Sequence, residues 1–232
     1  MIRPQMFSAE LWMAPPGEVV FESAGKSSSQ TVFSWVVPVG VYEACMLCIS
    51  SHRAFATRIS RGGADLLNTY WAAGTSGAAG GDGGDSGPNT GGPYRGGGGA
   101  GGYSGNGGTG GRSERDAFGN ISYFPGTAGQ GGGGNGGYPP DRGGSVGIYG
   151  PGIDSALRAG AGGTPNDPGA GDAGDWKPGG NLRYRNAVAV APGETITITL
   201  DHWVRDNSVG LGAIVRILWG PGRSFPNNAK AA

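Results

Sequence analysis

The chain has 232 residues, of which 52 are glycine and 16 are proline, and its formal net charge at pH 7 is zero. Glycine and proline disfavour helix interiors, so this composition argues against an all-helical fold and against a doubly wound α/β enzyme. With 17 basic and 17 acidic residues, the chain has no charge excess that would favour nucleic acid or an anionic membrane as a partner. Hydrophobic residues make up 37% of the chain, which is enough for one hydrophobic core.

The first 30 residues contain large apolar side chains interrupted by Pro4, Pro15 and Pro16. The prolines break up any helix, and the segment is too apolar for a free tail. We therefore expect residues 1–30 to dock on another protein or on a second copy of this chain. The expected assembly residues are Phe7, Leu11, Trp12 and Phe21. The segment has no basic stretch followed by an apolar one, as a signal peptide would, and no window of the chain approaches the roughly 18 apolar residues of a membrane helix, so we expect no membrane insertion.

Short runs rich in β-branched and aromatic residues predict strands on both sides of the chain's centre. They cover residues 31–37, 41–50, 53–60, 186–191, 194–200 and 212–219. Residues 31–73 and 181–226 each contain too few strands to close a core alone, so we expect the two halves to pair into one antiparallel sheet or β-sandwich. Residues 227–232 are expected to be a tail.

The region between these halves, residues 74–180, contains 42 of the 52 glycines and is called the glycine-rich region below. Residues 98–112 read as triplets, GGA-GGY-SGN-GGT-GGR. A period of three fits a polyproline-II-like helix with three residues per turn, in which glycines leave bare backbone along one or two edges. The triplet runs are too short for collagen. Because pairing of the flanking halves brings the ends of this region together, we expect it to fold back several times as an inserted bundle of short polyglycine-II helices. Disorder is the alternative that composition alone favours. The predicted fold class is mainly β, an antiparallel β-sandwich carrying that bundle.

Three segments resemble a known family. FSWVVPVGV (33–41) is similar to the W-x-V-P-x-G-V opening of glycine-rich domains in tailed-bacteriophage tail and virion proteins. VAPGETITITL (190–200) resembles their PGE strand, and VRILWGPGRSFP (215–226) resembles their closing segment. The resemblance implies polyglycine-II sandwiches, some of them at the tips of tail fibres where loops contact the host. In this chain the PGE strand comes after most of the glycine, and ACMLCIS (44–50) has no glycine run directly after it, unlike the family pattern.

The sequence offers no constellation for catalysis or metal binding. Cys45 and Cys48 are the only cysteines, and a zinc site would need more ligands than they and the two histidines offer in this spacing. Positions three apart on a strand face opposite sides, so we expect two buried structural cysteines and no disulfide. GGDGGD (80–85) fits half of a calcium-binding nonapeptide, in one copy only, and three RGG triplets lie far apart. Asp201 and His202 are adjacent on a strand and point to opposite faces. We predict no enzyme activity, no cofactor, no metal and no nucleic-acid binding.

Aromatic residues of the glycine-rich region form the candidate binding set. We expect Tyr94, Tyr103, Tyr123, Phe124, Tyr138, Tyr149 and Trp176 to be exposed, although they could instead cover the bundle. The longest interruption of the glycine pattern, residues 112–125, is expected to be a binding loop, because long loops on rigid scaffolds more often carry function. The predicted receptor-binding residues are Tyr94, Phe118, Tyr123, Phe124, Tyr138 and Ile153.

These observations predict a bacteriophage virion protein of the tail tip or tail fibre, assembled in the host cytoplasm. Its expected partners are other virion proteins, a host cell-surface glycan or outer-membrane protein, and a second copy of itself. The alternative is a purely structural virion component, such as a capsid decoration or a baseplate cap, without receptor binding.

Overall fold

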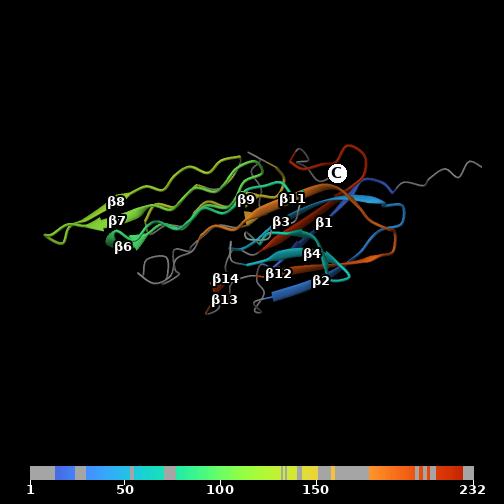
Figure 1. The fold of residues 1–232 in the computed structure, drawn as a ribbon, viewed down its shortest axis with the longest axis horizontal. Helices are drawn as coiled ribbons and strands as arrows, with labels where there is room; N and C mark the ends of the chain where they lie inside the picture. Colours follow the sequence, from blue (N-terminus) through green and yellow to red (C-terminus); the bar gives the residue numbers. More distant parts are fainter. Residues whose placement is uncertain are drawn as a thin grey trace, which may run out of the picture.

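The structure is a computed structural model that describes residues 14–23, 30–52, 55–70, 77–131, 133, 135–139, 143–150, 158–159, 178–201, 204–205, 208–209 and 213–226. Within these residues the protein is mainly β, with antiparallel pairing throughout and no helix (Figure 1). This agrees with the mainly β class that the strand patterns predict.

Fifteen strands occur in the described part of the chain. They are β1 Gly17–Glu22, β2 Gln30–Val36, β3 Glu43–Ile49, β4 Thr57–Arg61, β5 Ala64–Asn68, β6 Gly91–Arg95, β7 Arg112–Arg115, β8 Ile121–Phe124, β9 Val146–Gly147, β10 Arg158–Ala159, β11 Leu182–Ala189, β12 Thr195–Asp201, β13 Val204–Arg205, β14 Ser208–Val209 and β15 Ile214–Trp219.

Two four-stranded sheets join the two halves of the chain. One has the order β1-β15-β3-β11 and the other the order β2-β12-β4-β5. Each contains strands from before and after the glycine-rich region, as in the pairs β3 with β15 and β2 with β12. The prediction that the two halves pair is therefore confirmed at the level of strand pairing.

Residues of both sheets meet in one hydrophobic cluster. Strand β12 has the sequence TITITLD, and its Ile196, Ile198 and Leu200 are fully buried in this cluster while the intervening threonines point away. Met46 of β3 and Ile217 of β15 enter it from the other sheet. The alternation in β12 is the pattern of a strand with one buried face.

Strand β3 is buried on both faces. Met46 and Cys48 belong to the cluster shared by the two sheets, whereas Cys45, Leu47 and Ile49 belong to a second cluster on the opposite side of β3. A strand covered on both faces has a continuous apolar sequence instead of an alternating one, which explains EACMLCI. The two cysteines are free and buried, and they lie in different clusters, as predicted.

Part of the predicted docking segment belongs to the fold. Strand β1 pairs along its whole length with β15, so the sheets begin at residue 17 and not at residue 31. Phe21 packs against the core, with its ring centroid 5.3 Å from that of Phe33. Phe7, Leu11 and Trp12 lie outside the described residues.

The glycine-rich region is held by backbone hydrogen bonds that recur every third residue. Segments 81–87 and 96–102 are antiparallel, with the amides of Gly81, Gly84 and Gly87 donating to carbonyls of the second segment at 2.8–3.0 Å. The amides of Gly96, Gly99 and Gly102 donate in the same way to segment 105–111. Gly107 and Gly110 donate back to Asp82 and Asp85, so each of the three segments bonds to both others.

This spacing leaves no room for side chains between the segments. A Cβ built on Gly84, Gly98, Gly101, Gly107 or Gly110 would come closer to a neighbouring backbone atom than the 3.0 Å that real Cβ atoms keep. These positions belong to the two glycine frames that the triplet pattern predicts to face neighbouring backbone, and the glycines there serve close packing.

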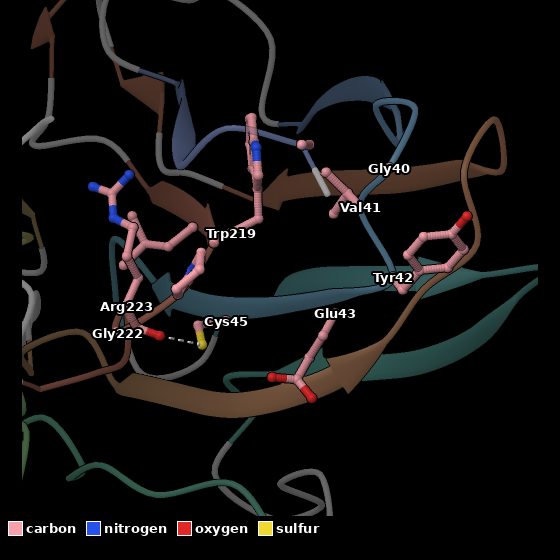
Figure 2. A pocket seen from close by; sticks show the side chains of 12 residues that line it. Gly40, Val41, Tyr42, Glu43, Cys45, Trp219, Gly222 and Arg223 are labelled. Atoms are coloured by element: carbon pink, nitrogen blue, oxygen red, sulfur yellow. Dashed lines mark hydrogen bonds between the residues drawn. The ribbon is translucent and has the colours of Figure 1, made fainter. Parts of the chain in front are cut away.

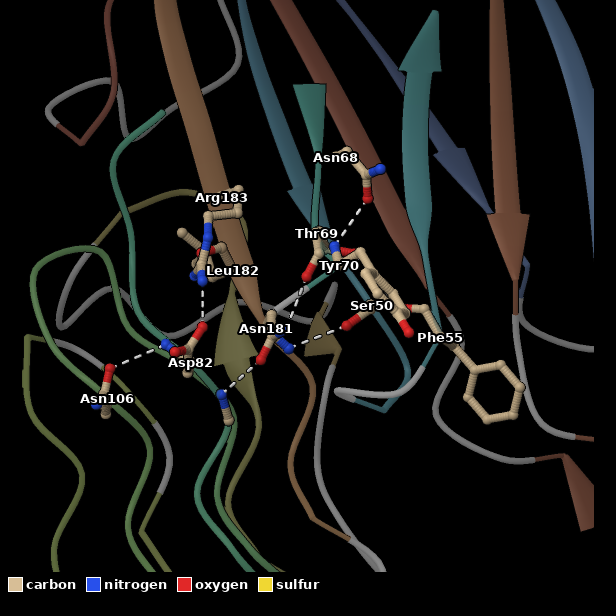
Figure 3. Close-up of polar contacts among 11 residues, drawn as sticks. Ser50, Phe55, Asn68, Thr69, Tyr70, Asp82, Asn106, Asn181, Leu182 and Arg183 are labelled. Atoms are coloured by element: carbon tan, nitrogen blue, oxygen red, sulfur yellow. Dashed lines mark hydrogen bonds and ion pairs between the residues drawn. The ribbon is translucent and has the colours of Figure 1, made fainter. Parts of the chain in front are cut away.

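A polar joint connects this region to the sheets (Figure 3). The buried Asn181 donates from its side-chain amide to the carbonyl of Thr69 at 2.7 Å, and its backbone amide donates to the hydroxyl of Ser50 at 2.9 Å. Its side-chain oxygen accepts from the amide of Gly83 at 2.9 Å. Through its side chain and its backbone amide, Asn181 thus ties the start of the glycine-rich region to Thr69 after β5 and to Ser50 after β3. The ion pair between Arg183 and Asp82 lies beside it.

Candidate functional site

The end of the glycine-rich region farthest from the two large sheets carries a small sheet of its own, with the order β6-β7-β8 (Figure 1). Strands β7 and β8 form a hairpin in which Ser113 pairs with Tyr123. Residues 112–125 were predicted to be a loop, and most of them are instead paired strands. Pairing satisfies the backbone polar groups that a loop of this length would leave to the solvent.

Three tyrosine rings form a ladder across this sheet. The centroid of Tyr123 lies 6.1 Å from that of Tyr94 and 5.9 Å from that of Tyr138. Tyr123 is 40% exposed and Tyr138 is 47% exposed. The structure therefore brings together three of the predicted binding residues, drawn from three separate segments of the glycine-rich region.

The turn between β7 and β8 presents Phe118, whose side chain is 91% exposed. The carboxylate of Asp116 holds this turn, because it accepts hydrogen bonds from the amides of Phe118 and Asn120 and from the Asn120 side chain at 2.8–2.9 Å. The hydrogen bond from the Asn120 side chain is the main reason that the pKa of Asp116 lies below its ordinary value. The turn is thus fixed by its own polar groups while its aromatic side chain faces the solvent.

Phe124 and Ser113 support the small sheet from within. The guanidinium of Arg112 lies 4.3 Å from the Phe124 ring centroid, and it also bonds the carboxylate of Glu114 at 2.8 Å. The buried Ser113 hydroxyl accepts from the Tyr94 amide at 2.8 Å and donates to the Tyr94 carbonyl at 2.7 Å. Tyr94, Phe118, Tyr123, Phe124 and Tyr138 are called the aromatic tip below.

The remaining predicted aromatic residues do not join the aromatic tip. Tyr103 was predicted to be exposed, and this is wrong: it is buried against the large sheet, where its hydroxyl donates to the Gly147 carbonyl at 3.0 Å. Burial raises its pKa. Tyr149 packs beside the same cluster, and Ile153 and Trp176 lie outside the described residues.

A pocket of about 300 Å³ lies beside β3 and β15 of the first large sheet (Figure 2). It is lined by Gly40 and Val41 on one side and by Trp219 and Arg223 on the other, so the opening and closing motifs of the sequence meet here. The thiol of Cys45 donates to the Arg223 carbonyl at 3.2 Å, and burial raises the pKa of this thiol. A neutral thiol with a raised pKa is a poor nucleophile.

The closing motif also contributes a buried ionic cluster that sequence reasoning did not single out. The fully buried Arg216 donates to the Glu18 carboxylate at 2.5 and 3.1 Å and to the Ile148 carbonyl at 3.0 Å. Its guanidinium lies 4.4 Å from the Tyr149 ring centroid, and Arg223 bonds the same carboxylate at 3.3 Å. In the sequence, the position of Arg216 between apolar neighbours in VRILW (215–219) was the signal for a buried ion pair. The cluster links β1, β15 and the glycine-rich region.

Among the described residues, no group of three or more histidine, cysteine, aspartate or glutamate side chains gathers in a way that could hold a metal ion. None of these residues belongs to a helix with the length and apolarity needed to cross a membrane. No protein-family model, no curated protein and no solved structure matches the chain.

Proposed function

We propose that this chain is a structural protein of a tailed-bacteriophage virion, at the tail tip or on a fibre, and that its aromatic tip binds the host surface. The observation that carries the proposal is the position of Tyr123, Tyr138 and Phe118, which are exposed at the end of the glycine-rich region opposite the two large sheets. The aromatic tip lies far from the two large sheets, which contain the opening and closing motifs. A surface in that position could contact the host while the sheets bind the rest of the virion.

The proposal includes a finer architecture. The two four-stranded sheets are a β-sandwich, which the shared cluster of Met46, Ile198 and Ile217 supports. The glycine-rich region is a bundle of polyglycine-II helices, which the hydrogen bonds at every third residue support, since β-strands bond with a period of two. Such a bundle would be rigid and would hold the aromatic tip at a fixed distance from the two large sheets.

The chemistry of the aromatic tip fits a glycan or an outer-membrane protein. Half-exposed tyrosine rings offer flat apolar faces together with a hydroxyl, a combination that is common in recognition surfaces. Phe118 on a turn fixed by Asp116 adds an apolar contact without a large loss of loop entropy on binding. Neighbouring Arg112 and Glu114 supply polar groups.

Adsorption of virions tests this function. Virions carrying both Phe118→Ala and Tyr123→Ala should adsorb to host cells at least about tenfold more slowly, because aromatic anchors at the centre of a contact commonly contribute about 2 kcal/mol or more. Tyr70→Ala is the matched control, since Tyr70 is 39% exposed on the large-sheet side and Tyr123 is 40% exposed at the aromatic tip. The amount of variant chain per particle is measured in parallel.

Unchanged adsorption by particles that carry the full amount of the double variant would contradict receptor binding. It would favour the alternative, a purely structural virion component. That alternative has an observation of its own, because the rings of Tyr94, Tyr123 and Tyr138 also contact each other and so cover the end of the glycine-rich region. A reconstruction of the whole particle would locate the chain and separate the two.

A further inference from the structure

The edge strands of the two large sheets differ in how they are protected against pairing with another chain. Natural edge strands are commonly protected by charges, bulges, shortness or a covering segment. Edge strand β1 carries Glu18 and Glu22. Edge strand β5 is short, contains Asp65 and pairs through a bulge. Edge strand β11 has a bulge after Arg185 and is bonded by Ala79.

Among the residues that the structure describes, none of these devices protects strand β2. Its sequence, QTVFSWV, is seven residues long and contains no charge, no glycine and no proline. In the described part of the chain it pairs only with β12. Val32 and Val36 are 57% and 59% exposed on its outer face. A long, uncharged edge rich in β-branched and aromatic residues is the type of edge on which another strand adds.

The backbone of β2 shows which residues are available for such pairing. The Val37 amide donates to the Glu194 carbonyl at 2.9 Å, and the Val37 carbonyl accepts from the Gly193 amide at 2.9 Å. Backbone groups of successive residues alternate between the two sides of a strand. Val36, Ser34 and Val32 therefore direct their amides and carbonyls to the side of β2 away from β12, where no described strand pairs with it.

These positions are self-complementary. In an antiparallel pair of two β2 strands centred on Ser34, each Ser34 faces its equivalent and each Val32 faces Val36 of the other copy. Both facing residues then have outward-directed backbone groups, as the bonded pairs of an antiparallel ladder require. The valines form apolar cross-strand pairs on the outer face, and no like charges face each other. In a two-fold dimer both copies use the same surface, so Val32 of each copy contacts Val36 of the other.

We infer that two copies of this chain pair through their β2 edges, antiparallel and centred on Ser34, so that the β2-β12-β4-β5 sheet continues from one copy into the other. This interface lies on the large sheets and leaves the aromatic tips of both copies free. The interface also pairs the uncharged β2 edge with β2 of the second copy in one register.

Analytical ultracentrifugation of the full chain over a range of concentrations tests the interface. Wild type should sediment as a concentration-dependent dimer, and Ser34→Lys should raise the dimer dissociation constant at least about tenfold, because it places like charges opposite each other at the two-fold axis. Thr197→Lys is the matched control, since Thr197 is the β12 neighbour of Ser34 on the same outer face but is not at the edge. It should leave the dissociation constant within about twofold of the wild-type value.

A cysteine cross-link tests the register and does not depend on the stability of the lysine variant. Ser34→Cys should form a disulfide-linked dimer under mild oxidation, because facing Cα atoms in a bonded pair are about 5.5 Å apart. Thr197→Cys should not, since its equivalents would be about 14 Å apart at a strand spacing of about 4.8 Å. A wild-type chain that stays monomeric to about 100 μM would overturn the inference, as would a dimer that Ser34→Lys leaves intact or that cross-links equally through both cysteines.

Discussion

The two large sheets and the glycine-rich region are packed in opposite ways. In the sheets, side chains such as Ile198 and Met46 fill the space between backbones. In segments 81–87, 96–102 and 105–111, backbone packs directly on backbone and the glycines leave no space to fill. The sheets should therefore be sensitive to the removal of atoms, and the glycine-rich region should be sensitive to their addition.

The comparison also separates the sources of stability. Burial of apolar side chains stabilises the sheets by roughly 25 cal/mol per Å². Glycine loses more conformational entropy on folding than any other residue and contributes no side chain to bury. The glycine-rich region consequently depends on its hydrogen bonds and on contacts such as Tyr103 against the large sheet.

The largest expected effect is loss of the ionic cluster that joins the regions. Glu18→Ala should lower the free energy of unfolding by about 3–5 kcal/mol, because it removes the carboxylate that accepts two hydrogen bonds from the buried Arg216 guanidinium. Glu114→Ala, which removes an exposed ion pair with Arg112, should cost less than about 1 kcal/mol. Chemical unfolding measures both. Equal losses would mean that the buried cluster contributes no more than a surface pair.

The next largest effect tests the sensitivity to added atoms. A Cβ on Gly108 would collide with the backbone of Thr127 and Gly136, so Gly108→Val should cost about 3 kcal/mol, the upper end of the usual cost of overpacking. The neighbouring Thr109→Val adds no atom and keeps the β-branched shape, and its cost should be below about 1 kcal/mol. Thermal unfolding of both variants is the measurement, and equal melting temperatures would contradict the packing assigned to the glycine frames.

A smaller loss of stability is expected at Ser113, a position in the glycine-rich region where a side chain forms hydrogen bonds to the backbone. Ser113→Ala should cost about 1–3 kcal/mol, because it removes the hydroxyl that satisfies both backbone groups of Tyr94. Ser122→Ala, on the exposed side of the same hairpin, should change stability by less than about 0.5 kcal/mol. Urea unfolding measures the stability of both variants, and a Ser113 variant as stable as wild type would show that Tyr94 has another partner.

The smallest effect is a local response to pH. Hydrogen bonds from Asn120 lower the pKa of Asp116 in the folded state, so their contribution is fully present above the pKa of an unfolded aspartate and is lost as the pH falls through the lower, folded value. The amide resonances of Phe118 and Asn120 should titrate with a midpoint below that of an aspartate in an unfolded peptide. Asp116→Asn should abolish this titration, and a midpoint at or above the peptide value would contradict the hydrogen-bonded turn.

Local patterns predicted the strands that bury their own side chains. TITITL alternates and forms β12, and the uninterrupted apolar run around Met46 forms β3. Strands β1 and β5 were missed because GEVVFE follows two prolines in an interrupted segment and ADLLN is short and partly charged. Their pairing is decided by β15 and β4, which a local pattern does not contain.

The same limit applies to the candidate site. The triplets indicate which glycines face backbone, but they do not say which part of the region meets the large sheet. Tyr103 was therefore predicted to be exposed although it is buried, while Tyr94, Tyr123 and Tyr138 do come together. Residues 112–115, RSER, lack the β-branched side chains typical of strands, and only pairing with β6 and β8 makes them β7.

The position of β15 has a consequence for when the protein can fold. It lies between β1 and β3 in its sheet, so that β1 has no partner strand, and β3 has only β11, until β15 has been synthesised. Proteins dominated by such distant contacts fold in milliseconds to seconds, much more slowly than helical ones. During synthesis, the apolar β3 and the uncharged β2 emerge long before their partner strands and are exposed to aggregation. Folding of the sheets should therefore follow synthesis instead of accompanying it.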